Sequence, residues 1–556
     1  MRKLVALLLA ALVLLTVTAC GNQSFGGNKK PKPTKPTKPS TSDVSDPSEP
    51  DSDPGSDADK DSDNTTDGDG YTDGEPDPDG DFDTADGEDD EDFIIPVEDT
   101  NDSIPGGNTA DRLNPQKGGA DQEAAALREK ITGAADTLKP TGKVWYISRK
   151  GNDAYSGESP SKAWYSVSGY NANKSEIKPG DAVLFERGGV YRGNIRLIDG
   201  VTYGAYGTGP KPAIYGSPNN FASKDFWETT ETKNVWKCNE PISSDVGNIV
   251  FDHGRAVGIR VFTGADKLSA NLQYYYSQDD AAVYLYLEKN PAEVFYDIEF
   301  GVSGNLMQSN QNPYDITIDN LALKYGGTHA IRFEEGAKNI RVTNCEIGWV
   351  GGCVHWYDAA GNPTRLGNGV ELWNECDNVL VENNWIYQMY DTGVTNQGGM
   401  TADGYTQSNI TYRGNLIEYC TMSVELWTGG QERDTMKNVT VENNIMRFAG
   451  YGWGMVRTNH KSTAHIWSST GDRTYTAINC VVRNNIFDRS WKALLIQSGV
   501  AQPNIQYSGN SYYQKNDSET IVIYWEGDDR LSGETQEKME ESVRKVDAQA
   551  KKIQLL

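Results

Sequence analysis

The chain lacks a basic region. Its 556 residues include 52 Lys or Arg and 79 Asp or Glu, a net charge of −27. Residues 41–100 hold 25 acidic residues and a single Lys, so this segment carries −24 and the remaining chain only −3. Binding to nucleic acid requires clustered Lys and Arg that neutralise phosphates. We therefore expect no nucleic-acid partner, and we expect the folded part to be nearly neutral.

Aromatic residues are scarce in the first quarter of the chain. All 13 Trp lie between Trp145 and Trp525, and Tyr71 is the only Tyr before Tyr146. Residues 21–121 are rich in Pro, Lys and Thr and then in Asp, Ser and Gly, a composition that cannot bury enough apolar surface to fold. The pattern predicts an extended tether followed by one large folded region.

Long apolar runs are missing except at the start. A basic beginning is followed by an apolar run over residues 4–15 and by Val17-Thr18-Ala19-Cys20, which predicts a secretory signal over residues 1–20. The run is short for a transmembrane helix, and no second one follows. The end of the segment resembles a bacterial lipoprotein signal. That resemblance implies lipidation of Cys20 and an extracytoplasmic protein anchored to the bacterial membrane or cell surface. A soluble secreted protein is the alternative.

Cysteine motifs for metal binding are also absent. Six cysteines follow Cys20, and none has CxxC or Cys/His spacing, so we predict no metal site made by them. They are Cys238, Cys345, Cys353, Cys376, Cys420 and Cys480. Reduced thiols and disulfides both remain open.

A repeated Asn at the end of a short apolar strand organises the rest of the chain. It occurs in segments such as IRVTNCEI (340–347) and VTVENNIM (439–446), at intervals of 24 to 41 residues. The seven positions are Asn320, Asn344, Asn384, Asn415, Asn444, Asn485 and Asn510. Such a period predicts stacked coils of parallel strands with the Asn side chains in a ladder. A β-propeller or β-sandwich would need regularly spaced antiparallel hairpins, and these signals are missing.

Three segments precede these repeats: WYISRKGNDAYSGESPSKAW, KPGDAVLFERGGVYRG and GVTYGAYGTGPKPAIYGS. With them, residues 142–530 resemble the right-handed parallel β-helix superfamily that includes pectin and pectate lyases and several glycoside hydrolase families. The resemblance implies an all-β, pectin lyase-like solenoid that acts on polysaccharide. Residues 221–300 read as an antiparallel β insertion. Helical patterns over 122–141 and 531–556 predict an N-terminal cap helix and a C-terminal helix, and we expect a monomer.

A second strand in each coil carries the candidate site. The motif V-E-L-W occurs at 370–373 and again at 424–427. If Val370 and Val424 point inward, the alternation of strand side chains places Glu371 over Glu425 and Trp373 over Trp427, with one coil between each pair.

Two coils separate these glutamates by about 9.6 Å, near the upper end of the separation used by inverting glycosidases. We therefore predict that Glu371 and Glu425 are the acid and base. Asp391 is a third candidate carboxylate, placed to raise the pKa of a neighbour. The alternative is that these are solvated strand residues paired with Arg332 or Arg457.

The same face is expected to bind the substrate. Exposed Trp side chains stack on sugar rings, and two long loops, 348–369 and 459–480, would flank the face. The predicted binding residues are Trp373, Trp427, Gln397, Arg332, Glu334, His355, Arg457 and His460.

Three function classes fit this pattern. A glycoside hydrolase, which requires no cofactor, is favoured. A polysaccharide lyase would use Arg or Lys as base with Ca²⁺, yet no compact Asp cluster and no basic surface are evident. A glycan-binding adhesin would need the Trp residues but not the carboxylates. The sequence leaves the identity of the glycan open.

Overall fold

A computed structural model describes residues 118–556 with short gaps. The gaps are residue 360 and residues 400–403, 429–433, 457–462, 470–475, 499–503, 517–521 and 526–529. The predicted signal, Cys20 and the tether lie outside the described residues. No described helix is both long enough and apolar enough to cross a membrane.

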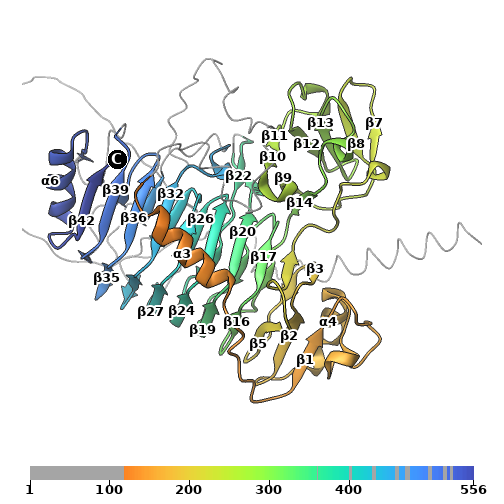
Figure 1. Cartoon of the computed structure of the whole chain (residues 1–556), viewed down its shortest axis with the longest axis horizontal. Helices are drawn as coiled ribbons and strands as arrows, with labels where there is room; N and C mark the ends of the chain where they lie inside the picture. Colours follow the sequence, from red (N-terminus) through yellow and green to blue (C-terminus); the bar gives the residue numbers. More distant parts are fainter. Residues whose placement is uncertain are drawn as a thin grey trace, which may run out of the picture. The chain divides into compact units, whose positions relative to one another are not determined.

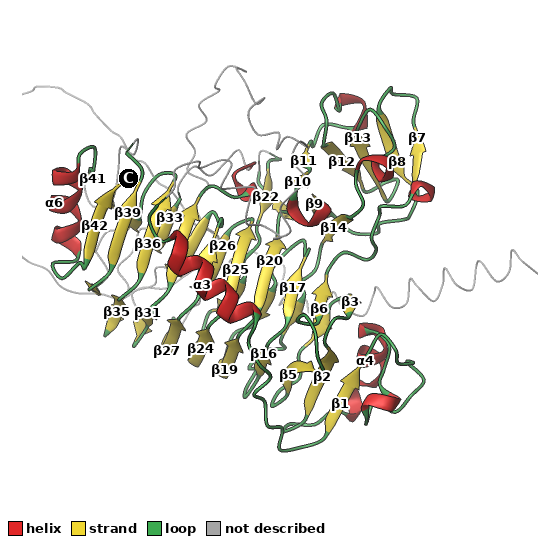
Figure 2. Cartoon of the chain, viewed as in Figure 1, coloured by secondary structure: helices red, strands yellow, loops and turns green. Residues whose placement is uncertain are grey.

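The repeats form a right-handed parallel β-helix, as predicted, whose coils each contribute strands to three parallel sheets (Figures 1 and 2). Sheet A contains β1 (Val144–Ile147), β2 (Ala182–Glu186), β5 (Thr202–Tyr206), β16 (Thr317–Asp319), β19 (Ala337–Thr343), β24 (Cys376–Glu382), β27 (Thr406–Arg413), β31 (Thr440–Glu442), β35 (Cys480–Arg483) and β38 (Ile505–Ser508), with β30 (Thr435–Lys437) and β34 (Thr476–Ile478) alongside. Sheet B contains β3 (Val190–Arg192), β6 (Ala213–Tyr215), β17 (Ala322–Lys324), β20 (Glu346–Val350), β25 (Trp385–Met389), β28 (Leu416–Glu418), β32 (Ile445–Ala449), β36 (Ile486–Ser490), β39 (Ser511–Gln514) and β42 (Lys552–Leu555). Sheet C contains β4 (Ile195–Arg196), β15 (Met307–Gln308), β18 (Ile331–Phe333), β23 (Val370–Trp373), β26 (Thr392–Gln397), β29 (Met422–Trp427), β33 (Ala464–Ser469), β37 (Leu495–Ser498), β40 (Val522–Trp525) and β41 (Arg530–Leu531).

The core consists of apolar side chains stacked in columns. In sheet C, Ile331, Val370, Val394 and Val424 are paired strand to strand, and each is fully buried. This register is the one that the V-E-L-W alignment predicts.

An asparagine ladder runs along the interior, but it has five members rather than seven. From Asn384 to Asn510, each side-chain amide donates to the Oδ1 of the Asn in the next coil at 3.0 Å. The ladder ends where the Asn510 amide donates to Asp547. Asn320 and Asn344 fall outside it. They occupy the preceding turn position, with φ of 61° and 54°, and Cys345 instead donates its N–H to the first Asn.

The difference between the seven predicted and the five observed members of the ladder has a local cause. The turn position before the ladder requires a positive φ, which Asn and Gly tolerate best. Asn383, Asn443 and Asn484 also occupy it, directly before a ladder Asn. Because adjacent positions both favour Asn, a single Asn in the sequence does not reveal which of the two it fills.

An antiparallel insertion separates β6 from β15, as predicted. Its strands are β7 (Trp227–Thr229), β8 (Val235–Cys238), β9 (Val246–Phe251), β10 (Ala256–Val257), β11 (Ile259–Arg260), β12 (Gln273–Ser277), β13 (Ala282–Tyr286) and β14 (Ile298–Val302), with the short helix α5 (Pro291–Val294) before β14. They form two small sheets that are antiparallel apart from the β11–β12 pair. A separate hairpin, β21 (Val354–Tyr357) and β22 (Pro363–Arg365), leaves the solenoid between β20 and β23.

The helices differ in part from the prediction. The expected N-terminal cap is present as α3 (Asp121–Thr132), but it lies across the outside of sheet B, against β25 and β28 (Figure 1). Helix α4 (Val167–Asn173) instead contributes Tyr170 to the first coils of the core. At the other end, α6 (Gln536–Val546) buries Met539 and Val543 against the core, whereas the predicted continuation of the helix is strand β42.

Buried charges hold α3 in place. Arg128 of the helix contacts Glu418 of β28 at 2.6 Å, and Arg447 contacts both Glu418 and Asp488 at 3.0 Å. The backbone N–H of Ala120 donates to Asp488 at 3.1 Å. An amphipathic helix must bury its apolar stripe, but its sequence does not specify the partner surface. The helix was therefore predictable, but its position was not.

Candidate functional site

The candidate carboxylates lie on sheet C in the predicted register. Glu371 of β23 pairs with Thr395 of β26, which pairs with Glu425 of β29. Arg332 of β18 pairs with Glu371 on the other side. These side chains point away from the core because Val370, Val394 and Val424, one position earlier, point into it.

The prediction that the outward-pointing side chains of sheet C are exposed to solvent is wrong for most of them. Glu371 is 1% exposed and Glu425 is 4% exposed, and Trp427, Gln397 and Asp391 are also buried. Among the predicted residues, Arg332, Glu334 and Trp373 are partly exposed and His355 is exposed. Strand alternation determines which side of a strand a residue occupies. It does not determine what packs over that side.

Glu371 is surrounded by polar partners. One oxygen lies 2.6 Å from His329 Nδ1 and accepts from the Asn368 amide at 3.2 Å, and the other lies 3.1 Å from Arg332 Nη1. Burial alone would raise the pKa of this carboxyl, but the attraction of His329 and Arg332 outweighs it and lowers the pKa to about 2. Glu371 is therefore ionised at neutral pH.

His329 is a site residue that the sequence interpretation missed. It stands two residues before Ile331, at the start of the segment HAIRFE, and it is one of only five His in the chain. Its ring is 1% exposed, and Nε2 has no hydrogen-bond partner among the described residues. His355 of the β21–β22 hairpin lies with its ring centre 5.7 Å away. The alignment of HAIRFE with NGVELW was the available signal, because it places His329 beside the carboxylate row.

Glu425 has a different environment. Thr395 donates its hydroxyl to Glu425 at 2.8 Å. Thr395 thus lies between the two glutamates and contacts the second directly.

A partly exposed cluster adjoins Glu371. Glu334 accepts from Gln308 at 2.8 Å and from Arg332 at 3.1 Å, and the Arg332 guanidinium lies 5.2 Å from the ring centre of Trp373. Trp373 is therefore oriented by a cation and remains partly open to solvent. Of the two predicted Trp platforms, only this one is accessible.

The remaining predicted residues lie elsewhere or are not described. Asp391 lies between β25 and β26, directly before the strand that carries Thr395. Arg457 and His460 lie outside the described residues. Within the described part of the chain, no three His, Cys, Asp or Glu side chains are grouped to hold a metal ion. The sequence left open whether the six cysteines after Cys20 form disulfides. In the structure all six are buried free thiols.

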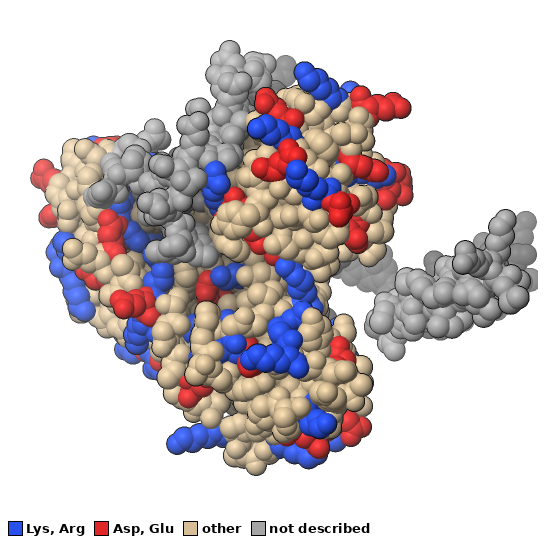
Figure 3. All heavy atoms as spheres, turned by 45° about the vertical axis from the view of Figure 1, so that its right-hand side comes forward, with Lys and Arg blue, Asp and Glu red and all other residues tan. Residues whose placement is uncertain are grey.

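The surface around the fold is of mixed charge. In the view of Figure 3, acidic and basic side chains are interspersed, and neither sign forms a continuous cover over the described residues.

Comparisons with known proteins establish no family for this chain. No family model matches it, and no curated protein matches it. Among solved structures, it is similar to a glycoside hydrolase, with 9% identity, a TM-score of 0.33, and coverage of 69% of this chain and 95% of that one. It is also similar to an alginate lyase from Paenibacillus sp., with 12% identity, a TM-score of 0.31 and coverage of 65% and 96%. A polygalacturonase from Erwinia carotovora has 10% identity, a TM-score of 0.29 and coverage of 71% and 98%. At these identities the likeness concerns the fold, a β-helix found among hydrolases and lyases of carbohydrates.

Proposed function

We propose that this protein is a glycoside hydrolase whose site lies on the outer side of β23, β26 and β29. The observation that carries the proposal is the pair of buried carboxylates, Glu371 and Glu425, in one column two coils apart. Burying ionisable groups costs free energy, and strongly shifted pKa values are concentrated at functional sites.

The environments of the two glutamates suggest their roles. Glu371, with a pKa of about 2, cannot hold a proton at neutral pH and fits the base that activates water, or a charge that stabilises a cationic sugar. Glu425, the other carboxyl of the column, then fits the acid. The approach of a sugar to these groups requires that binding open the covered face, and substrate-induced rearrangement of this kind is common in enzymes.

A lyase mechanism receives less support from the contacts. Its base would have to be an uncharged Arg or Lys, and the best placed candidate is Arg332. Glu371 and Glu334 both contact Arg332, and two adjacent carboxylates favour its charged form. Ca²⁺ dependence stays a prediction of this alternative.

The test uses the full chain on a panel of plant and mucin glycans, with and without a chelator. A hydrolase releases reducing sugar without new ultraviolet absorbance, a lyase produces an absorbing unsaturated product, and an adhesin binds without turnover. Glu371→Gln and Glu425→Gln should each lower the rate by about 10²–10⁴. Glu442→Gln, which alters an ion pair with Arg483 on sheet A, is the matched control.

Trp373→Ala should weaken substrate binding more than the chemical step, because stacking holds the ground state and the transition state nearly alike. Full activity in both glutamine variants would contradict the site assignment.

A further inference from the structure

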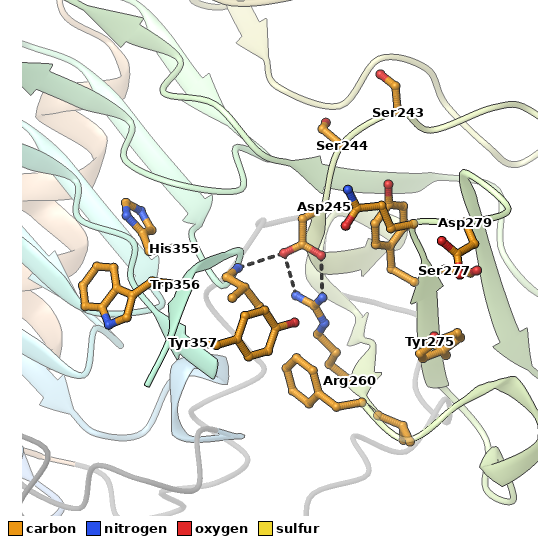
Figure 4. Close-up of a pocket in the computed structure, with 15 residues that line it drawn as sticks. Ser243, Ser244, Asp245, Arg260, Tyr275, Ser277, Asp279, His355, Trp356 and Tyr357 are labelled. Atoms are coloured by element: carbon orange, nitrogen blue, oxygen red, sulfur yellow. Dashed lines mark hydrogen bonds and ion pairs between the residues drawn. The ribbon is translucent and has the colours of Figure 1, made fainter. Parts of the chain in front are cut away.

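A cavity of about 390 Å³ lies between the antiparallel insertion and the β21–β22 hairpin. The insertion contributes the segments around Ser243, Phe262 and Ser277, and the hairpin contributes residues 354–357 (Figure 4). Neither Glu371 nor Glu425 is among the residues that line the cavity, whereas His355 is.

The walls of this cavity are fixed by one ion pair. Asp245 accepts from Arg260 Nη1 at 2.9 Å and from the backbone N–H of Val354 at 2.8 Å, so it joins the insertion to the hairpin (Figure 4). Arg260 also donates to the carbonyl of Gly352 at 3.4 Å. A cavity whose two sides are already joined loses little conformational entropy when it binds a ligand.

Aromatic faces line the cavity and are open to solvent. Tyr357 is 60% exposed and Phe262 is 39% exposed, and Tyr275 is partly exposed. The Phe262 ring is already covered by Arg260, whose guanidinium lies 4.6 Å from the ring centre. Tyr357 is the most exposed aromatic side chain of the described lining, and the partly exposed Trp356 lies next to it in the hairpin. Polar groups of Ser243, Ser244 and Gln278 surround these rings.

The charge of the lining limits the class of ligand. Arg260, the only Lys or Arg among the described residues of the lining, is paired with Asp245. Asp279 is exposed at the rim and has no ion-pair partner among the described residues. Arg365, whose guanidinium lies 5.5 Å from the Phe262 ring centre, balances Asp279, so these groups give the cavity no excess positive charge that would attract a uronate, sialate or phosphate group.

From this combination we infer that the cavity is a binding subsite for an uncharged sugar unit of a glycan. Stacking aromatics with surrounding hydroxyl and amide groups recognise the apolar face and the hydroxyls of a pyranose. The hairpin also contributes His355 to the lining (Figure 4), and its ring centre lies 5.7 Å from that of His329, which contacts Glu371. A bound glycan could extend along this shared wall. The inference adds a ligand class to the proposed function but is tested by binding alone.

The experiment measures binding of the full chain, carrying Glu425→Gln to prevent turnover, to an oligosaccharide array of neutral, uronate-containing and sialylated glycans. We expect binding to neutral glycans, with affinity measured afterwards by calorimetry on the strongest one. Tyr357→Ala should lower that affinity by roughly tenfold, and Tyr357→Phe should retain it. Tyr296→Ala, which removes a 68% exposed tyrosine of the insertion that does not line the cavity, should have no effect.

Binding only to acidic glycans, or to none, would overturn the inference. Unchanged affinity in Tyr357→Ala would also overturn it. If that variant binds normally while Trp373→Ala does not, the subsite is wrong but the site proposed on sheet C stands. If Tyr357→Ala loses binding and the wild-type chain shows no turnover of the same glycan, the subsite stands and the hydrolase proposal fails.

Discussion

His329 Nδ1 lies 2.6 Å from Glu371 Oε2, and both side chains are 1% exposed. The contact joins the segment before β18 to the neighbouring strand β23, and Arg332 completes the same ion-pair cluster. Burying the carboxylate of Glu371 beside the Arg332 guanidinium is costly, since each ion loses its hydration. This cost is the physical reason to expect that the cluster serves the reaction rather than the stability of the solenoid.

The first prediction concerns pH. The attraction of His329 and Arg332 lowers the pKa of Glu371 from its ordinary value of 4.5 to about 2 in the folded protein. Its ionised form therefore stabilises the fold fully above about pH 5, and this contribution disappears as the pH falls through 2. The free energy of unfolding of wild type minus that of Glu371→Gln should decrease over this window. Denaturant titrations at several pH values measure the difference, and a constant value from pH 6 to pH 2 would contradict the assignment.

The second prediction concerns the ladder. Asn444 binds Asn415 and Asn485 and also donates to the carbonyl of Tyr412. Asn444→Ala leaves buried groups without partners and should cost about 1–3 kcal/mol of unfolding free energy. Asn171→Ala removes one exposed hydrogen bond and should change stability by less than about 0.5 kcal/mol. Equal melting temperatures for the two variants would argue against the ladder's importance.

The third prediction concerns the attachment of α3. Asp488 is fully buried between Arg447, Arg489 and the N–H of Ala120. Asp488→Asn leaves buried guanidinium groups incompletely paired and should cost about 3–5 kcal/mol.

Release of α3 in this variant should appear as faster proteolytic cleavage within residues 121–132. Glu442→Gln alters a partly exposed pair with Arg483 and should cost at most about 1 kcal/mol, without faster cleavage. Cleavage of α3 at the wild-type rate in Asp488→Asn would show that other contacts hold the helix.

The fourth prediction concerns localisation and tests a residue outside the described part of the chain. If Cys20 carries a lipid, Cys20→Ala should move the protein from the membrane fraction to the medium without changing its melting temperature. Fractionation followed by immunoblotting measures this shift. Retention of the variant in membranes would rule out the anchor at Cys20.

The sequence was most informative where one strand determines the position of the next. The two V-E-L-W motifs predicted that Glu371 and Glu425 share one column with a coil between them, because stacked coils repeat their register, and Thr395 occupies that coil. The sequence was less informative about burial. The two motifs are identical, yet Trp427 is buried and Trp373 is partly exposed. His329 was overlooked because a single His carries no periodic signal. Its role depends on Glu371, which lies on another coil.

The docking of α3 has a consequence for the order of folding. The N–H of Ala120 and its acceptor Asp488 are 368 positions apart, and Arg128 and Glu418 are 290 apart. Contacts this remote in sequence form slowly, because a long loop must close before they provide any stabilisation. The coils can stack progressively through neighbouring contacts, whereas α3, the first described helix, must wait for nearly the last coils before it finds its surface. The helix that begins the fold is thus among the last parts to be secured.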